Sequence, residues 1–245
     1  MQVNRFGRTQ GALMGQIDIR LVGDAAVLAI AGDSVDPQTL RRVWSLYESI
    51  RATLVSGILD IVPAYASVLV RFDPALIDLP RVIAGIRGAA ERPGPSSLRS
   101  FRAWTVHVCF GGAHGIDFET AAHALGMREA RFRDALCKPE YRVAFLGFVA
   151  GFPYLIGLPP SLQLPRHATP RPRVPAGSVA IAGLQCGIYP RPSPGGWHVV
   201  GQTQVMLFDP SLDEPALLRP GDAVRFVPVE RFSETAHVQC DRLAQ

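Results

Sequence analysis

The N-terminal part of the chain switches between strand-like and helix-like patterns of apolar residues. Alternating and short apolar runs flank Gly23 in the stretch QIDIRLVGDAAVLAIAGD, which predicts a β-hairpin. In DPQTLRRVWSLYESIRATL the apolar residues recur at helical spacing, so we expect an amphipathic helix there. Asp36 is placed as the N-cap of this helix and Pro37 as its first residue.

Two β-rich runs and a second helix complete this first region. Pro63 divides GILDIVPAYASVLVRFD into the two runs, and Pro80 can interrupt the helix expected in PALIDLPRVIAGIRGAA. The order of strands and helices is typical of a small α+β sandwich. The proline, glycine and serine content of residues 91–100 marks the best domain boundary, so we expect one domain over 1–95 and another over 96–245.

The second region is rich in short strand-like runs. FRAWTVHVCF predicts a strand, after which a glycine turn leads into the helix FETAAHALG with Asp117 as its N-cap. A short helix, MREARFRDALC, and a strand-like run, YRVAFLGFV, come next. From Gly177 to Val229 the chain has only short apolar runs separated by turns, among them SVAIAG, WHVVG and QVMLFD. This pattern predicts a β-barrel or a β-sandwich for the second domain.

The composition is that of a globular protein with a sizeable core, since 48% of the residues are apolar and 19% are charged. No uncharged apolar run is long enough to cross a membrane. The N-terminal stretch MQVNRFGRTQGALMGQ lacks a hydrophobic segment followed by a small-residue cleavage site. We therefore expect a cytoplasmic location and no membrane partner.

Cysteine and lysine usage excludes several kinds of site. The four cysteines are scattered and form no CxxC pair, so we expect reduced, mostly buried thiols and neither a zinc knuckle nor a dithiol redox centre. Lys138 is the only lysine, and it lies in LCKPEY rather than at the end of a P-loop. The same residue would have to serve as a lysine base or form a Schiff base, and no suitable glycine or serine lies beside it. The net charge of +4 is therefore carried by arginine, and without a nucleic-acid motif no nucleic-acid partner is expected.

One segment combines stiffness with positive charge. Between Gly151 and Gly196 the chain has 17 glycines and prolines in 46 residues and no aspartate or glutamate, so we name it the acid-free segment. Its four arginines and His167 have no acidic neighbour in sequence, and an ordered loop of this kind can hold a carboxylate or phosphate. In the alternative interpretation the arginines pair with distant acids or face water. The aromatic residues of GFPYL and GGW then pack the loop onto the barrel.

The histidines and serines form no self-sufficient catalytic motif. His107 alternates with apolar residues in a strand, which favours a structural role. His114 and His123 lack the spacing of an HExxH motif, so no metal site is predicted. No GxSxG elbow is present, and Ser178 is better explained as a turn residue than as a nucleophile. His198, directly after GGW, is the best catalytic candidate, with a histidine on the barrel surface as the alternative.

Several motifs occur together in the order of one bacterial protein family. They are LVGDAAVLAI, IVPAYASVLVRFDP, GGAHGIDFETAAHALG, FLGFVAGFPYL, TPRPRVPAGSVAIAG and QCGIYPRPSPGGWHVVGQT. Over residues 17–230 the chain resembles the family that contains the B subunit of ATP-dependent 5-oxoprolinase and the sporulation-kinase inhibitor KipI. It is also similar to one half of the carboxyltransferase domain of urea carboxylase. The resemblance implies a small α+β N-terminal domain followed by a mainly-β, cyclophilin-like barrel, a fold that does not itself imply prolyl isomerase activity.

The same resemblance implies a component that is inactive alone. It would act in a cytoplasmic complex with a carboxyltransferase-like C subunit and a separate A subunit, cleaving 5-oxo-L-proline to L-glutamate with ATP and Mg²⁺. Two alternatives share the same motifs. The chain would then be a KipI-type inhibitor of a sensor histidine kinase, or one component of a complex that metabolises urea or allophanate.

Cleavage of 5-oxoproline needs positive donors more than it needs a nucleophile. A lactam carbonyl is a poor electrophile, and phosphorylation of its oxygen opens the carbon to attack by water. We expect catalytic roles for His198 and Tyr189. We expect the anion and the substrate to be bound by Arg171, Arg173, Gln185 and Gln202.

Some positions depart from the family pattern. The glycine turn commonly reads GGEFGPDL, and here Ala113, His114 and Ile116 replace the glutamate, the aromatic residue and the proline. Gln202 replaces the arginine that is usual in the family's GRT. These changes are tolerable for the fold, and they remove a carboxylate from the glycine turn.

Overall fold

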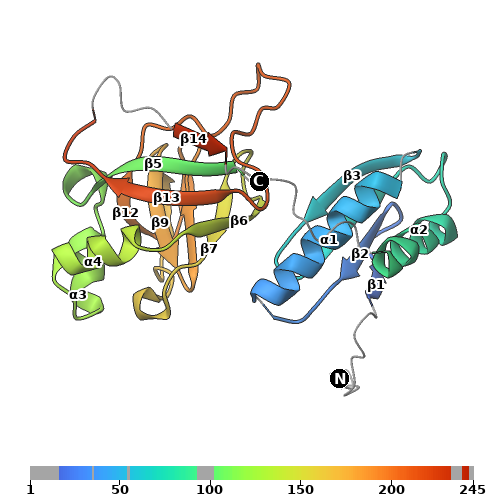
Figure 1. The fold of residues 1–245 in the computed structure, drawn as a ribbon, viewed down its shortest axis with the longest axis horizontal. Helices are drawn as coiled ribbons and strands as arrows, with labels where there is room; N and C mark the ends of the chain where they lie inside the picture. Colours follow the sequence, from blue (N-terminus) through green and yellow to red (C-terminus); the bar gives the residue numbers. More distant parts are fainter. Residues whose placement is uncertain (1–16, 35, 54–55, 93–101, 233–238, 243–245) are drawn as a thin grey trace. The chain divides into compact units, whose positions relative to one another are not determined.

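The computed structural model divides the chain into two compact units, Met1–Ser96 and Ser97–Gln245, which are described one at a time below (Figure 1). The residues that it describes are 17–34, 36–53, 56–92, 102–232 and 239–242. The domain boundary between residues 95 and 96 stays a prediction. So does the expectation that the two parts of the chain fold independently.

The first unit is built on a four-stranded antiparallel sheet with the strand order β1-β2-β4-β3. Its strands are β1 (Asp18–Leu21), β2 (Ala26–Ile30), β3 (Ile58–Pro63) and β4 (Ser67–Phe72). The hairpin around Gly23 is confirmed, because β1 pairs with β2 and Gly23 turns with a φ of +64°. The two runs divided by Pro63 are confirmed as β3 and β4.

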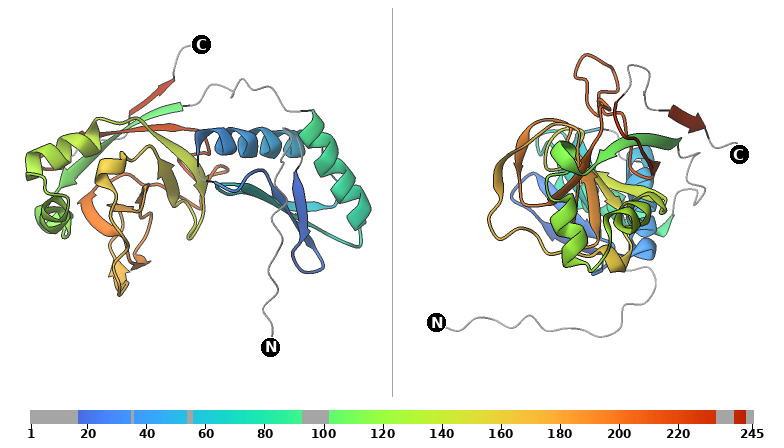
Figure 2. Two further views of the ribbon diagram at one scale, coloured as in Figure 1. Left: turned by 90° about the horizontal axis from the view of Figure 1, so that it is seen from below. Right: turned by 90° about the vertical axis from the view of Figure 1, so that its left-hand side faces the viewer.

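Helices α1 (Pro37–Thr53) and α2 (Leu79–Glu91) cover one face of this sheet (Figures 1 and 2). Val27 of β2 lies opposite Val70 of β4. The buried residues of these two strands occupy every second position, so their side chains point to the same face of the sheet. They form one core with Val43 and Ile50 of α1 and Val82 of α2. The predicted α+β layering of this unit follows from these two periodicities.

Both helices begin at a capping aspartate. The Asp36 carboxylate accepts the backbone N–H groups of Gln38 and Thr39, at 2.8 and 2.9 Å, which confirms the predicted cap. Asp78 caps α2 in the same way. The expectation that Pro80 interrupts this helix is wrong. Pro80 lies in the first turn of α2, where a backbone N–H has no partner within the helix, so proline is tolerated there.

The second unit is a closed seven-stranded barrel in the order β12-β9-β10-β7-β6-β13-β5. Strands β12 and β5 pair through Gly201 opposite Phe110 and close the cylinder. The strands are β5 (Arg102–Phe110), β6 (Tyr141–Leu146), β7 (Pro153–Ile156), β9 (Ser178–Ala182), β10 (Gln185–Ile188), β12 (His198–Gln202) and β13 (Ala223–Pro228). The predicted barrel is confirmed, and its likeness to cyclophilins stays a prediction.

Further elements decorate the barrel. Strand β14 (Gln239–Arg242) pairs antiparallel with β5, and β8 (Arg171–Val174) pairs with β11 (Ser193–Gly195) in a separate ribbon. The two helices α3 (Phe118–Ala124) and α4 (Glu129–Cys137) were both predicted, and they lie together beside the barrel (Figure 1). The run QVMLFD forms no strand, only an isolated bridge between Phe208 and Ala216. It was wrongly predicted because a short apolar run does not by itself distinguish a strand from irregular backbone; here Leu207 is buried while Met206 is 70% exposed.

The barrel core is apolar and contains the unbridged cysteine Cys186. Phe118 and Phe132 of α3 and α4 pack with Tyr141 and Ile181 in the same core cluster. The side chain of Cys186 is fully buried there, and burial raises the pKa of its thiol. The three cysteines whose side chains the structure describes are all unbridged, and two of them are buried, as predicted.

The backbone conformation at position 177, in the VPAGS motif, requires glycine. Gly177 has a φ of +76°, its N–H donates to the carbonyl of Tyr189 at 2.7 Å, and its own carbonyl accepts the N–H of Thr203 at 2.9 Å. A Cβ at this position would collide with the carbonyl oxygen of Thr203. Gly177 therefore ties together the ends of β10 and β12.

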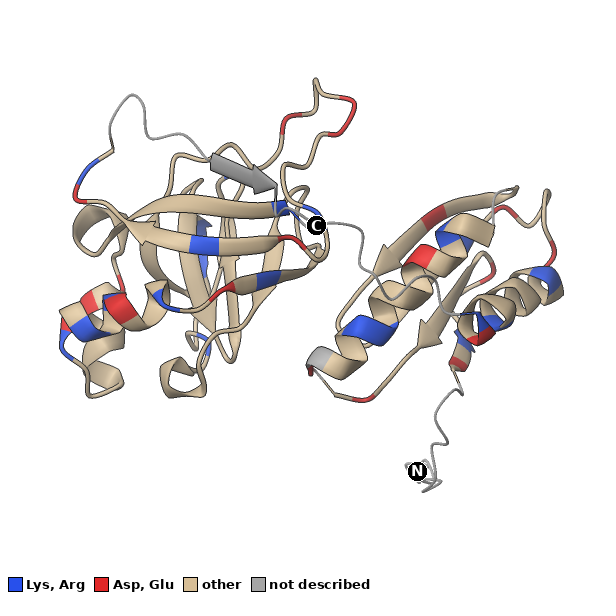
Figure 3. Cartoon of the chain, viewed as in Figure 1, with Lys and Arg blue, Asp and Glu red and all other residues tan. Residues whose placement is uncertain are grey.

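Charged residues are spread over helices and strands of both units (Figure 3). In the portions of the chain that the structure covers, no helix combines the length and the apolar character needed to cross a bilayer.

A buried carboxylate joins the starts of the parallel strands β5 and β13. Asp222, whose side chain is 4% exposed, accepts from the Arg102 guanidinium at 2.7 Å and from the Trp104 indole N–H at 2.9 Å. It also accepts the backbone N–H of Arg219 at 3.0 Å. Removing this carboxylate leaves a buried indole donor and a half-buried guanidinium without their acceptor.

We therefore expect Asp222→Ala to lower the free energy of unfolding by about 3 kcal/mol, measured by urea denaturation. The control is Glu214→Ala, which breaks the exposed ion pair between Glu214 and Arg219 and is expected to change stability by less than about 0.5 kcal/mol. Equal effects of the two substitutions would show that Asp222 is not a structural anchor.

Candidate functional site

A second buried carboxylate, that of Asp117, lies where the glycine turn after β5 meets α3. Its backbone N–H donates to the carbonyl of Val199 at 2.9 Å, and its Oδ2 accepts the Val199 N–H at 2.7 Å. Asp117 therefore pairs with β12 much as a neighbouring strand residue would. It occupies the predicted N-cap position of α3, but the prediction that its side chain caps the helix is wrong. The carboxylate is turned toward β12 and the acid-free segment instead.

Arg171, the first residue of β8, is the charged partner of this carboxylate. Its Nη2 donates to Asp117 Oδ1, and the Asp117 side chain is only 6% exposed. The other terminal nitrogen, Nη1, is buried and has no hydrogen-bond partner among the described residues. A buried N–H without an acceptor is unfavourable, so Arg171 is poised to donate to an anion.

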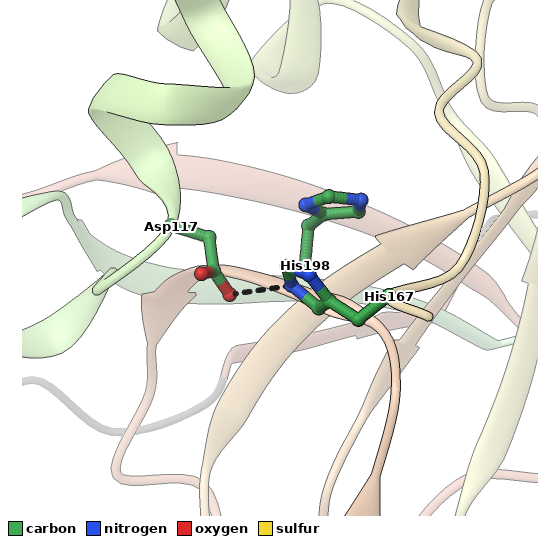
Figure 4. Close-up of side chains that lie close together, drawn as sticks. All are labelled: Asp117, His167 and His198. Carbon is green, nitrogen blue, oxygen red and sulfur yellow. Dashed lines mark ion pairs between the residues drawn. The ribbon is translucent and has the colours of Figure 1, made fainter. Parts of the chain in front are cut away.

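Two histidines complete the cluster (Figure 4). The Nε2 of His167 lies 3.4 Å from Asp117 Oδ2, too far for a good hydrogen bond, and it is buried without a hydrogen-bond partner in the described part of the chain. The rings of His167 and His198 are 4.1 Å apart between centroids. His198 Nε2 lies 2.8 Å from the carbonyl oxygen of Pro165. Because a carbonyl can only accept, this nitrogen carries the proton, and Nδ1 of the neutral ring keeps its lone pair.

Burial lowers the pKa of His198 below its ordinary value of 6.5. The hydrogen bond to the Pro165 carbonyl acts in the opposite direction, and the neighbouring His167 lowers the pKa further. His198 is therefore neutral at neutral pH, as a general base or a metal ligand must be.

Backbone contacts bring these segments together. The His167 N–H donates to the carbonyl of Gly196 at 2.8 Å, directly before Trp197 and β12. The Arg166 guanidinium lies 5.9 Å from the centre of the Trp197 ring. The stiff loop that carries His167 is thus held beside the start of β12, where His198 lies.

An aromatic cluster includes two residues of the acid-free segment, Phe152 and Tyr189. Tyr189 is 2% exposed, and its ring meets that of Phe152 edge to face at 5.2 Å. Burial raises the pKa of Tyr189, and the charges of Arg166 and Arg171 partly offset this rise. Phe148, with a φ of +65°, packs its exposed ring edge to face on Phe152 at 5.6 Å. Packing of the aromatic residues in GFPYL and GGW onto the barrel is confirmed for Phe152 and Trp197, which belong to one core cluster.

The predicted site residues do not all gather at one point. Arg171 and His198 lie together around Asp117, and Tyr189 is close enough to Arg171 for its pKa to respond. Arg173 is exposed two residues further along β8, so its side chain does not share the buried surroundings of Arg171.

The two predicted glutamines lie elsewhere on the barrel. Gln202 Nε2 donates to the carbonyl of Ala176 at 2.9 Å, and its Oε1 lies 2.8 Å from His114 Nδ1. Gln185 begins β10, half-buried and opposite Ala182. Roles for Arg173, Gln185 and Gln202 in binding stay predictions.

Sequence reasoning did not predict that Asp117 lies at the centre of this cluster, nor that His167 Nε2 lies 3.4 Å from its carboxylate. One signal was present: a segment without acids must find its counter-charge elsewhere, and for Arg171 the predicted distant acid is Asp117. Nothing in the spacing of the residues identified which acid it would be.

Comparison with known proteins gives a consistent result. The sequence profile of the family described as carboxyltransferase domain, subdomain C and D, matches residues 17–218. The 5-oxoprolinase B subunit of Escherichia coli O157:H7 is 39% identical over 211 residues, covering 85% of this chain and 94% of that protein. The protein of the same name from Bacillus subtilis strain 168 is 34% identical over 221 residues, covering 86% of this chain and 92% of that protein.

Solved structures resemble the chain as well. The crystal structure of TTHA0988 superimposes with a TM-score of 0.76 at 36% identity over 88% of this chain, which spans 41% of that protein. The K. lactis urea amidolyase superimposes with a TM-score of 0.72 at 20% identity over 90% of this chain and 16% of that protein. The second likeness concerns the fold alone.

The lowered pKa of His198 predicts a pH dependence of stability. The unfolded chain binds the proton at the ordinary value of 6.5 and the folded chain only at lower pH. The unfolded state therefore binds more protons in this interval, and the contribution of His198 to stability falls as the pH drops below 6.5. We expect His198→Gln to lose part of this fall in urea denaturation, and an NMR titration to place the His198 midpoint below 6.5. A titration midpoint of His198 at or above 6.5 would show that its pKa is not lowered in the folded chain.

Proposed function

Because the chain belongs to the family of carboxyltransferase domains, subdomains C and D, we propose that it is the B subunit of an ATP-dependent 5-oxoprolinase. Relatives with that name are 34% and 39% identical to it over most of their own length. The proposal extends to their implied partners, the A and C subunits, and to a cytoplasmic location. The chain spans 41% of TTHA0988, which is consistent with a unit that works beside further polypeptide.

The observation that carries the proposal is the buried, unpartnered Nη1 of Arg171 beside the Asp117 carboxylate. One arm of the guanidinium is fixed by Asp117, so the other is held in place before any ligand arrives. A rigid guanidinium nitrogen suits a carboxylate or a phosphoryl oxygen. 5-Oxoproline carries a carboxylate, and ATP-dependent activation of its lactam creates phosphoryl oxygens.

The histidines supply the second requirement, a group that can accept a proton from water. His198 is oriented through Nε2 by the Pro165 carbonyl, so its Nδ1 lone pair is the free basic site. Tyr189 lies buried within the acid-free segment, which also carries Arg171, and its hydroxyl would orient bound substrate. ATP and Mg²⁺ would activate the lactam within the assembled complex, and this chain would hold and orient the activated substrate.

The proposal is tested by reconstitution. We expect the purified chain alone to show negligible ATP-dependent release of glutamate from 5-oxoproline, and activity to appear when the A and C subunits from the same organism are added. If the complete mixture makes no glutamate, the proposed function is wrong.

Within the active mixture, Arg171→Ala is expected to lower kcat/KM about 100-fold, because a fixed donor to a developing charge is lost. Arg191→Ala is the matched control, since Arg191 lies in the same acid-free segment with an exposed side chain, and it should leave the rate within about twofold of wild type. An Arg171→Ala enzyme as active as the Arg191→Ala enzyme would overturn the site while leaving the function intact.

A further inference from the structure

We propose that Asp117, His167 and His198 bind one divalent transition-metal ion of the Zn²⁺ class. One ligand atom from each residue can be chosen so that all three lie within 4.8 Å of one another. Across the part of the chain that the structure describes, this is the one group of three or more histidine, cysteine and acidic side chains with such an arrangement.

The separation of two of the ligand atoms already suits a tetrahedral ion. Zinc bonds to nitrogen and oxygen are about 2.0–2.1 Å long, so two ligands of a tetrahedral zinc lie roughly 3.3 Å apart. Asp117 Oδ2 and His167 Nε2 are 3.4 Å apart. This distance is long for a hydrogen bond and close to the edge of a zinc tetrahedron.

An orphaned atom provides a second observation. His167 Nε2 is buried, and within the described ranges it has no hydrogen-bond partner, although most buried polar atoms in proteins have one. A metal bound to its lone pair would satisfy this atom. The neighbouring His198 ring, 4.1 Å away between centroids, places a second imidazole beside it.

Outer contacts orient the ligands as in known metal sites. A ligating histidine usually donates its other ring N–H to a carbonyl or carboxylate. His198 does so through Nε2 to the Pro165 carbonyl, at 2.8 Å, which leaves the Nδ1 lone pair for the metal. In the metal-bound site this lone pair would therefore not serve as the base of the proposed function. The Asp117 carboxylate is held by the Val199 N–H and by Arg171.

The ligand set also indicates what kind of site this is. Three protein ligands, two imidazoles and one carboxylate, leave a zinc ion with an open position of the kind found in catalytic rather than structural sites. The Arg171 charge beside the carboxylate opposes a bare dication, so an anion in the open position would balance the local charge. The site could not be recognised from a contiguous sequence motif, because the three ligands come from three separate segments of the chain.

The test uses the full chain, freed of metal by a chelator, and no partner subunit or substrate. Titration with Co²⁺ should give visible d–d bands that saturate at one ion per chain, and Zn²⁺ should displace the cobalt. His167→Gln and His198→Gln should each weaken Co²⁺ and Zn²⁺ binding at least about 100-fold, since even outer contacts of a metal ligand are worth 10–100-fold in affinity. Far-UV circular dichroism of each variant checks that the fold is kept.

The matched control is His123→Gln, which removes an exposed histidine of α3 and should leave both titrations unchanged. Absence of saturable Co²⁺ bands in the wild-type chain would overturn the proposal, and so would an equal loss in the His123→Gln variant. Because the readout needs neither 5-oxoproline nor a partner, metal binding and 5-oxoprolinase activity can fail independently of each other.

Discussion

The candidate site of the second unit depends on one buried charge, the Asp117 carboxylate. An isolated carboxylate taken out of water is very unfavourable, so its position dictates what must surround it. The backbone of Val199 and the guanidinium of Arg171 meet that demand, and in doing so they bind the acid-free segment to β12 and to the start of α3. The acid-free segment is thus held in place by Asp117, which lies 54 residues away from Arg171 in the sequence.

The glycine turn before α3 is tied to β12 by a side-chain contact. His114 Nδ1 lies 2.8 Å from Gln202 Oε1, so a hydrogen bond joins the turn to the strand. The Nε2 of Gln202 also donates to the carbonyl of Ala176 at 2.9 Å. Gln202 therefore connects β12 with both the glycine turn and the VPAGS motif.

Periodicity and capping predicted most of the helices and strands, because both depend on neighbours in the sequence. The cap at Asp36 could be recognised for this reason. One error arose where a tertiary contact decides: Asp117 has the sequence context of a cap, yet its carboxylate binds Arg171 and the backbone of β12. The candidate site could be predicted only in part, since His198 and Arg171 stand in a distinctive segment, whereas the acid that unites them is fixed by barrel closure.

The chemistry of the site follows from how that acid is shared. One carboxylate oxygen of Asp117 is used by Arg171, and the other faces His167 as well as the Val199 N–H. The pair of Asp117 and Arg171 is neutral as a unit, so a positive species at the second oxygen raises the local charge and attracts an anion to the free arm of Arg171. A metal ion bound by Asp117, as proposed above, would act in this direction. The proposed metal site at Asp117 and the proposed anion site at Arg171 would therefore support each other.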